Sequence, residues 1–474
     1  MMIFNKLWIF LFVLGMVNIA CSTSRPDTIN SNEQISYVSG TPNFTVSSFG
    51  TVDGDQIKIL VTTSILPSSL ISVANDSIES GTEAVGVFVE FEINSETSDS
   101  IIASRNVKKE LTIDRDERRQ SEDLFKFTEE FEIESPGTYN VIISIIDLVS
   151  GKREIINSRV IIPDPDAKVL GLSNTLMKQK MEKEDGFSIV TGYNINADKN
   201  YIEFENNISN DVEFDSITVY SKLIKFESDL DPAKKLGAPS FSVTVLDRNG
   251  IQYNNEEILS EQRRVIKLND EVLSYKIGFE TPDIGNYRYL IQVKNENGEE
   301  LTRAFDFGVK SEEFPYVRTP EQLAESLVYL MNEDEYEDIM SIANMDSLKK
   351  AVDDFWLRNI QNIDKAEKTI EIYYQRVEEA NKRFTSYKEG WKTDQGMIYI
   401  LFGPPMFSRT TFNFIHWSYS TDRYSDRYNY FFNKERRPTR EFPFTVYLLD
   451  RSNNELNNNE YLIVQKWLTG NIEN

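Results

Sequence analysis

The chain has 474 residues, too many for one ordinary domain, and its 40% hydrophobic and 12% aromatic content can form buried cores. Its formal net charge of −25 argues against nucleic acid as a partner, because an acidic surface repels phosphate. The single cysteine, Cys21, excludes an intramolecular disulfide, and the single histidine, His416, excludes the usual histidine zinc sites. We therefore expect no metal and no cofactor, and we expect His416 to be a core or surface residue.

The first twenty residues have the pattern of a signal peptide. Lys6 precedes an apolar run over residues 7–17, which is too short to cross ~30 Å of hydrocarbon as a helix. The residues Asn18-Ile19-Ala20-Cys21 then resemble the lipobox of bacterial lipoproteins. That resemblance implies cleavage before Cys21 and lipid on its thiol, so we expect a cell-envelope protein, in the outer membrane facing the periplasm or the cell surface. The alternative is a secretory peptide that is cleaved elsewhere. Residues 21–37 are polar and Ser/Asn-rich and are expected to form a tether.

Residues 38–166 predict a β-sandwich. In the run 85–93, apolar side chains alternate with acidic or small ones, which is typical of a strand with one buried face. Further strand-like runs cover residues 58–62, 141–146 and 155–162, and Pro163-Asp164-Pro165-Asp166 ends the domain.

Residues 167–313 are predicted to be a second copy of this domain. Tyr139 and Tyr287 lie 148 residues apart, and each follows a Gly-x pair and precedes a strand, a glycine-containing hairpin turn and a second strand. Such tyrosines resemble the tyrosine corner of immunoglobulin-like sandwiches. Alternatively, the similarity between the two regions is a chance convergence of two β-hairpins. We expect both sandwiches to be spacers or binding modules, since they contain no catalytic residue set and no D-x-D-x-D-G calcium loop.

Residues 314–474 predict an α+β domain with three helices and a small antiparallel sheet. Thr319-Pro320-Glu321-Gln322 is a capping signature for the first helix, and Asp346 is expected to cap the second. The third apolar stripe runs over residues 370–384. The acids of residues 333–338 are expected to form a solvated face. Strand-like aromatic runs follow at residues 414–419, 428–432, 442–449 and 461–467.

The motif Gly390-Trp391-Lys392-Thr393-Asp394 precedes Gly396, the run 397–402 (MIYILF) and Gly403-Pro404-Pro405. We expect Gly390 to end the long helix in a left-handed conformation, Thr393 and Asp394 to form a side-chain-capped turn, and residues 397–402 to form a buried strand that Gly403-Pro404-Pro405 stops.

These residues, with Phe355-Trp356, Arg376-Val377, Ala380, Phe384 and Tyr399, resemble the GWxTD domain over about residues 315–474. The resemblance implies an exported lipoprotein with β-rich N-terminal regions. The family has no established activity, so no catalytic residue can be carried over and the catalytic residues, if any, stay unknown. Trp391 and Asp394 either lock helix to strand or form a recognition surface for a partner.

Two functions from different classes stay open. The first is a binding or scaffolding lipoprotein of the cell envelope with an unidentified envelope protein as partner. The second is an envelope hydrolase in the C-terminal domain, which requires a cleft with two carboxylates roughly 5–10 Å apart. Serine, cysteine and H-E-x-x-H hydrolase motifs do not occur in the sequence.

Overall fold

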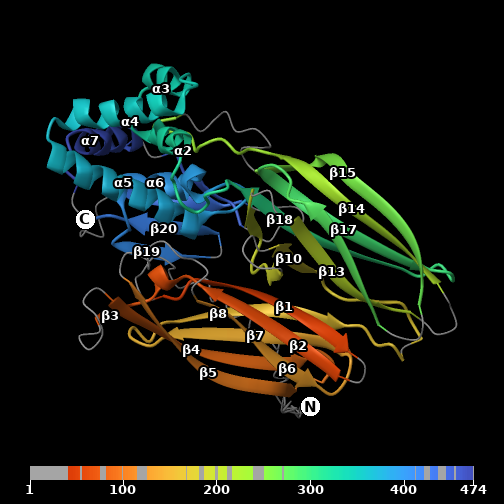
Figure 1. The fold of residues 1–474 in the computed structure, drawn as a ribbon. Coiled ribbons are helices and arrows are strands. Elements are labelled where there is room, and N and C mark those ends of the chain that lie inside the picture. The colour runs from red at the N-terminus through yellow and green to blue at the C-terminus, as the bar shows by residue number, and fades with distance from the viewer. Residues whose placement is uncertain are drawn as a thin grey trace, which may run out of the picture.

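The computed structural model describes residues 41–472 apart from 54–55, 75–81, 99, 115–124, 167, 181–185, 198–200, 211–215, 239–249, 269–271, 412, 421–427, 436–444 and 453–454. The expected signal peptide, Cys21 and the tether lie outside the described residues. Two pairs of sheets are followed by a helical region with a small sheet of its own. Figure 1 shows the first pair (red to orange) lying beneath both the second pair (yellow to green) and the helical region (cyan to blue).

The first pair of sheets packs face to face around one apolar core. One layer has the order β1 (Phe44–Asp53), β2 (Gln56–Ile65), β6 (Lys126–Ile133). The other has the order β3 (Val73–Ala74), β4 (Thr82–Ser95), β7 (Gly137–Asp147), β8 (Arg153–Ile162), with β5 (Ile101–Asp114) also paired to β4. A short turn of 3-10 helix, η2 (Pro67–Ser69), follows β2. The alternation expected for residues 85–93 is confirmed, because Val85, Val87, Val89, Phe91 and Ile93 are all buried in this core.

The second pair has the same plan with additional short strands. One layer has the order β11 (Phe187–Ile189), β10 (Leu176–Lys180), β13 (Tyr201–Ser209), β16 (Leu273–Glu280), and β9 (Gly171–Leu172) also pairs with β13. The other has the order β12 (Asn194–Asn196), β18 (Glu300–Lys310), β17 (Gly285–Asn295), β14 (Ser216–Ser228), β15 (Ile251–Lys267). All pairings are antiparallel except that of β12 with β18.

Strand order repeats between the two pairs of sheets. The run β5-β4-β7-β8 corresponds to β15-β14-β17-β18, and β1-β2-β6 corresponds to β10-β13-β16. The tyrosine hydroxyls of β7 and β17 make the same contact, because each donates to the carbonyl four residues earlier, Tyr139 to Ser135 and Tyr287 to Asp283. The likeness therefore extends from the two hairpins to most strands of both layers, and the tyrosines have the geometry of a tyrosine corner.

The helical region has more helices than the three expected. They are α2 (Pro320–Glu325), η5 (Ser326–Tyr329), α3 (Glu333–Met340), α4 (Met345–Ile360), α5 (Ile363–Phe384), η6 (Gly390–Lys392), α6 (Asp394–Phe402) and α7 (Leu456–Leu468). The small antiparallel sheet has the order β19 (Phe407–Thr410), β20 (Phe414–Ser418), β21 (Asn429–Lys434), β22 (Tyr447–Leu449). None of the helices in the described residues is long and apolar enough to cross a membrane.

The sequence predicted the N-terminal cap of one helix correctly and that of another helix wrongly. Thr319 and Gln322 form the predicted capping box at the start of α2. The second predicted helix is α4, but its cap is Asn344, whose side chain accepts from the amide of Ser347, and not Asp346. The acids of residues 333–338 lie in α3 and are mostly exposed, as expected for a solvated face.

Three predictions at the motif and beyond it were wrong. Residues 397–402 form the end of helix α6 and not a strand, and residues 461–467 lie in helix α7. Residues 397–401 are all buried, so this run has no face pattern, and periodicity cannot separate a strand from a helix there. Gly390 does not end α5 in a left-handed conformation, because α5 ends at Phe384 with an extended Thr385 as its cap. Gly403 has the positive φ, +80°, and ends α6.

Replacement of Tyr287 by phenylalanine should lower the free energy of unfolding by about 1 kcal/mol, because the carbonyl of Asp283 loses its donor. Denaturant titration measures the change. The matched control is Tyr289→Phe, since the buried hydroxyl of Tyr289 has no hydrogen-bond partner among the described residues. If both variants lose the same stability, the tyrosine corner contributes nothing specific.

Candidate functional site

Trp391 of the motif is a core residue. It lies in η6 with 3% of its surface exposed. Its indole nitrogen donates to Glu389 Oε2 over 3.0 Å, and its carbonyl accepts the hydroxyl of Tyr329 over 2.9 Å. The rings of Trp391 and Tyr329 meet edge to face at 6.2 Å between centroids. This burial favours the locking turn over a surface anchor for a partner.

The motif glycines allow backbones to touch. A Cβ atom on Gly390 would lie 1.9 Å from the carbonyl oxygen of Ala380 in α5, and one on Gly396 would lie 1.9 Å from the carbonyl oxygen of Gly390. Thr393 caps α6, because its hydroxyl accepts from the amide of Gly396 and donates to the carbonyl of Gly390. The helices α5, η6 and α6 therefore pack with their backbones in direct contact, which explains why glycine stands at both positions.

Asp394 carries the buried charge of the motif. Its side chain is 7% exposed, and its two oxygens accept from the guanidinium of Arg451 at 2.7 and 3.2 Å and from the amide of Leu449 at 2.7 Å. Arg451 also donates to the carbonyl of Lys234 over 2.7 Å. One carboxylate thus connects the motif, the end of β22 and the loop after β14.

That loop, residues 229–238, belongs to the second pair of sheets but enters the helical core, and we call it the insert. Leu236 is fully buried among the apolar residues of the helical region. Lys235 donates to the carbonyl of Met331, and the amide of Gly237 donates to Glu460 Oε2 over 2.9 Å. The insert therefore fastens the second pair of sheets to the helices.

The residues just before the motif, 386–389, form the opposite connection, and we call them the docking segment. Tyr387 packs with Ile224, Phe226, Ile251 and Val446 in a separate apolar cluster, and its carbonyl accepts from Asn286 over 2.8 Å. The amine of Lys388, itself buried, donates to Asp229 Oδ2 over 3.2 Å and to the carbonyl of Asp231 over 2.7 Å. Neither residue could be recognised from the sequence, because all the partners named here except Val446 lie more than 100 positions away.

Gly403, Pro404 and Pro405 form the exit from α6. The carbonyl of Gly403 accepts the hydroxyl of Tyr419 over 2.8 Å. Pro404 is exposed and Pro405 is half-buried. His416 lies away from these contacts, on β20, where its ring stacks on Phe431 at 4.3 Å and its Nε2 pairs with Asn429 Oδ1 over 2.8 Å.

Buried charges gather where the docking segment meets β18. The amine of Lys310 is buried, donates to the carbonyl of Ser386 over 3.0 Å, and its pKa falls to about 7 because burial disfavours the charged form. Burial alone would raise the pKa of Glu389, but Lys392 and the donors of Ser311 and Trp391 bring it below its ordinary value. Burial raises the pKa of Glu325.

Glu325 and Glu389 each lie within 4 Å of the amine of Lys392, at 3.9 and 3.8 Å. A pair of carboxylates with opposite pKa shifts is a pattern that hydrolases use. Glu389, however, is buried and already accepts from the amide and hydroxyl of Ser311 and from Trp391. Its oxygens are already used by Ser311 and Trp391, which gives the pair a structural role.

Replacement of Asp394 by asparagine should lower the free energy of unfolding by about 3 kcal/mol, because Arg451 would stay buried without its counter-charge. Chemical denaturation measures the loss. The control is Asp353→Asn, whose exposed pair with Lys349 should contribute no more than about 0.5 kcal/mol. Equal losses in the two variants would mean that the buried pair is not what holds the motif.

Lys310 gives stability a pH dependence. Its pKa in the folded chain, about 7, lies below that of an unfolded lysine. Between these two values the unfolded chain binds a proton that the folded chain releases, so the free energy of unfolding rises with pH. Urea titrations at pH 7 and about pH 9 should show wild type gaining stability relative to Lys310→Met, by the linkage of folding to protonation. Lys108→Met, a change at an exposed lysine, is the control. Parallel pH profiles for wild type and Lys310→Met would contradict the burial argument.

Comparison with known proteins gives one family match. Residues 288–469 match the GWxTD domain, so the match begins inside β17, earlier than the expected residue 315. No curated protein matches the chain.

Three solved structures are distantly similar to the chain. The fibronectin(III)-like modules of Clostridium thermocellum CbhA match with 11% identity over 58% of this chain and 98% of that chain, with a TM-score of 0.15. Red sea bream transglutaminase matches with 7% identity over 56% and 31%, with a TM-score of 0.17. The C-terminal domain of the Streptococcus pyogenes antigen I/II-family protein AspA matches with 6% identity over 56% and 99%, with a TM-score of 0.17. Scores this low carry no argument about this chain. The family match shows that the chain contains a GWxTD domain, which spans residues 288–469 and includes the motif, the docking segment and β18.

Proposed function

We propose that this protein is a lipid-anchored binding or scaffolding protein of the bacterial cell envelope. It is held by lipid on Cys21, in the outer membrane facing the periplasm or the cell surface, and residues 21–37 are its tether. The apolar run at residues 7–17 and the lipobox-like residues before Cys21 support the anchor. Its partner is an envelope component and not nucleic acid, as the net charge of −25 suggests.

In this proposal the chain has two immunoglobulin-like sandwich domains, residues 38–166 and 167–313, and a GWxTD-like domain, residues 314–474. The shared strand order and the shared tyrosine contact support the two copies. The insert and the docking segment hold the second sandwich against the helices. Such a connection suits a rigid carrier of binding surfaces.

One observation carries the choice of scaffold over hydrolase. The polar groups of the motif are used inside the fold: Asp394 by Arg451 and Leu449, and the indole of Trp391 by Glu389. A carboxylate that acts as acid, base or nucleophile must reach substrate. The motif therefore contributes rigidity, and the binding surfaces lie elsewhere.

Cys21→Ser should release the protein from the membrane fraction, because a protein without its acyl chains has no stable anchor. Cell fractionation and metabolic labelling with radioactive palmitate measure the loss. Crosslinking in intact cells should capture a reproducible envelope component with wild type.

The control is an unrelated soluble protein fused behind residues 1–37 of this chain, which carries the proposed anchor alone. Capture of the same components by this fusion would refute a binding function for the folded part. Unchanged membrane association of Cys21→Ser would refute the lipid anchor.

A further inference from the structure

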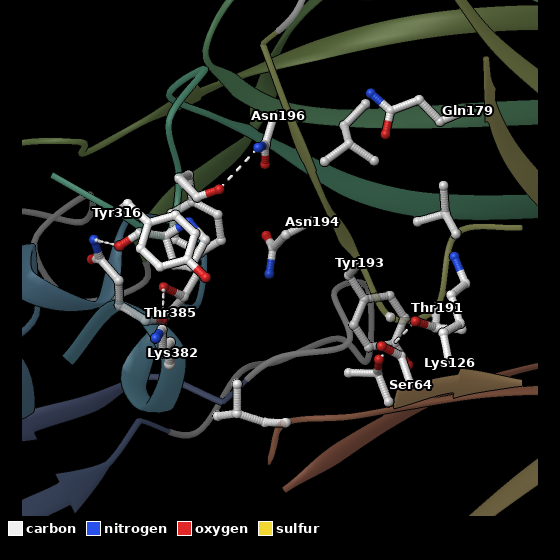
Figure 2. A pocket seen from close by; sticks show the side chains of 18 of the residues that line it. Ser64, Lys126, Gln179, Thr191, Tyr193, Asn194, Asn196, Tyr316, Lys382 and Thr385 are labelled. Carbon is white, nitrogen blue, oxygen red and sulfur yellow. Dashed lines mark hydrogen bonds between the residues drawn. The ribbon is translucent and has the colours of Figure 1, made fainter. Parts of the chain in front are cut away.

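A cavity lies where the two pairs of sheets and the helical region meet, and we call it the junction cavity. Its volume is about 880 Å³, within the range of small-molecule sites. The first pair of sheets contributes residues near the ends of β1, β2 and β6. The second pair contributes residues 179–180 and 188–196, and the helical region contributes residues 312–316, residue 318 and the end of α5 (Figure 2).

The walls of the junction cavity are held together by direct hydrogen bonds. The hydroxyls of Thr45 and Thr191 lie 2.9 Å apart, and Lys126 donates to the hydroxyl of Ser188 over 2.7 Å, which joins the first and second pairs of sheets. Asn196 donates to the carbonyl of Phe314 over 2.9 Å, which joins β12 to the segment before the helices. The cavity is therefore formed before any ligand enters, and binding requires little rearrangement.

The charge of the lining is opposite to that of the protein. Five lining residues are cationic and two are acidic, a formal excess of three positive charges in a chain of net charge −25. At one wall Arg318 and Lys382 both lie over the ring of Tyr316, at 4.8 and 5.0 Å from its centroid. Lys126 lies on the opposite side in Figure 2, and Lys180 also lines the cavity. A concave surface of this kind concentrates anions.

The uncharged part of the lining is rich in amides and hydroxyls. Figure 2 shows the side chain of Asn194 pointing into the open space between Tyr193 and Tyr316. Tyr193, which is 44% exposed, lines the cavity together with Ser64 and Thr385. Amides, hydroxyls and aromatic faces are the groups that hold a polyhydroxylated ring, because they pair with hydroxyls and cover the apolar faces of the ring.

We propose that the junction cavity binds an anionic oligosaccharide, with lysine and arginine side chains pairing its carboxylates and Tyr193 covering a sugar ring. The proposal deepens the binding function above by naming a ligand class, but it does not depend on the lipid anchor. An acidic peptide has the same charge and is the competing ligand. The amide and hydroxyl lining favours the saccharide.

The test uses the purified full-length chain in detergent, with trigalacturonic acid as the probe and isothermal titration calorimetry as the readout. The neutral trisaccharide galactotriose should bind at least about tenfold more weakly, which corresponds to ~1.4 kcal/mol. Affinity for trigalacturonic acid should also fall as ionic strength rises, because the attraction is screened.

Three variants locate the site. Lys382→Gln and Tyr193→Ala should each weaken binding by about tenfold, because one removes a cation of the wall and the other an aromatic face. Lys108→Gln removes an exposed lysine of β5 that does not line the cavity, and it should bind like wild type. Thermal melting checks that all variants fold, and Lys180→Gln, a change at an exposed lining residue, replaces any variant that does not.

Each other outcome overturns the proposal. Absence of measurable binding, or binding of galactotriose as tight as that of trigalacturonic acid, contradicts a site for an anionic saccharide. Tighter binding of hexaglutamate than of trigalacturonic acid assigns the cavity to an acidic peptide. An equal loss in Lys108→Gln means that the probe binds the surface at large. Because the detergent-purified chain is used, failure here is separate from failure of the anchor.

Discussion

The ion pair of Asp394 and Arg451 holds three distant parts of the chain at one point. Asp394 starts α6, Arg451 follows β22, and Arg451 also reaches the carbonyl of Lys234 in the insert. Removing two charges from water is costly, and the pair is tolerated because nearly every oxygen and donor in it has a partner. Arg451 neutralises Asp394 of the motif and donates to the Lys234 carbonyl of the insert, so the motif and the insert stabilise each other through one guanidinium.

The contacts of β18 and Ser311 with the docking segment agree with where the family match begins. A GWxTD domain that started at α2 would lack β18, whose Lys310 holds the docking segment, and it would lack Ser311, which donates to Glu389. The match starts at Arg288 and so includes β18 and the buried pair of Arg288 with Asp306 across β17 and β18. The last hairpin of the second pair of sheets is thus a structural part of the domain, although it belongs to another sheet.

Features that depend on near neighbours could be predicted from the sequence. The capping box at Thr319 needs only Gln322, and the buried face of residues 85–93 needs only the alternation of strand side chains. The Gly-x-Tyr repeat was visible because its contact spans four residues. Residues 397–402 were wrongly predicted to be a strand because the run is apolar all round. Asn344 was not predicted as the helix cap because Asp346, two residues later, is an equally good cap.

Features that depend on distant partners could not be predicted. Nothing around Leu236 indicates that it leaves the sheets for the helical core, and nothing around Lys388 indicates that Asp229 and Asp231 receive it. The motif was recognised as a turn, but its packing partners Ala380 and Tyr329 come from elements that the sequence does not place beside it. The role of Glu389 likewise depends on Ser311, which lies 78 positions away.

Residues that line the junction cavity also hold the motif backbone. Asn381 of α5 is buried, accepts from the amide of Trp391 over 3.1 Å, and donates to the carbonyl of Pro315 over 2.9 Å. Asn381 and Pro315 both line the cavity. The position of the cavity wall is thus fixed by the same amide side chain that holds the motif backbone. A motif that is too buried to bind anything itself can in this way determine the shape of a site next to it, because a shift of Trp391 would move Asn381 and with it Pro315.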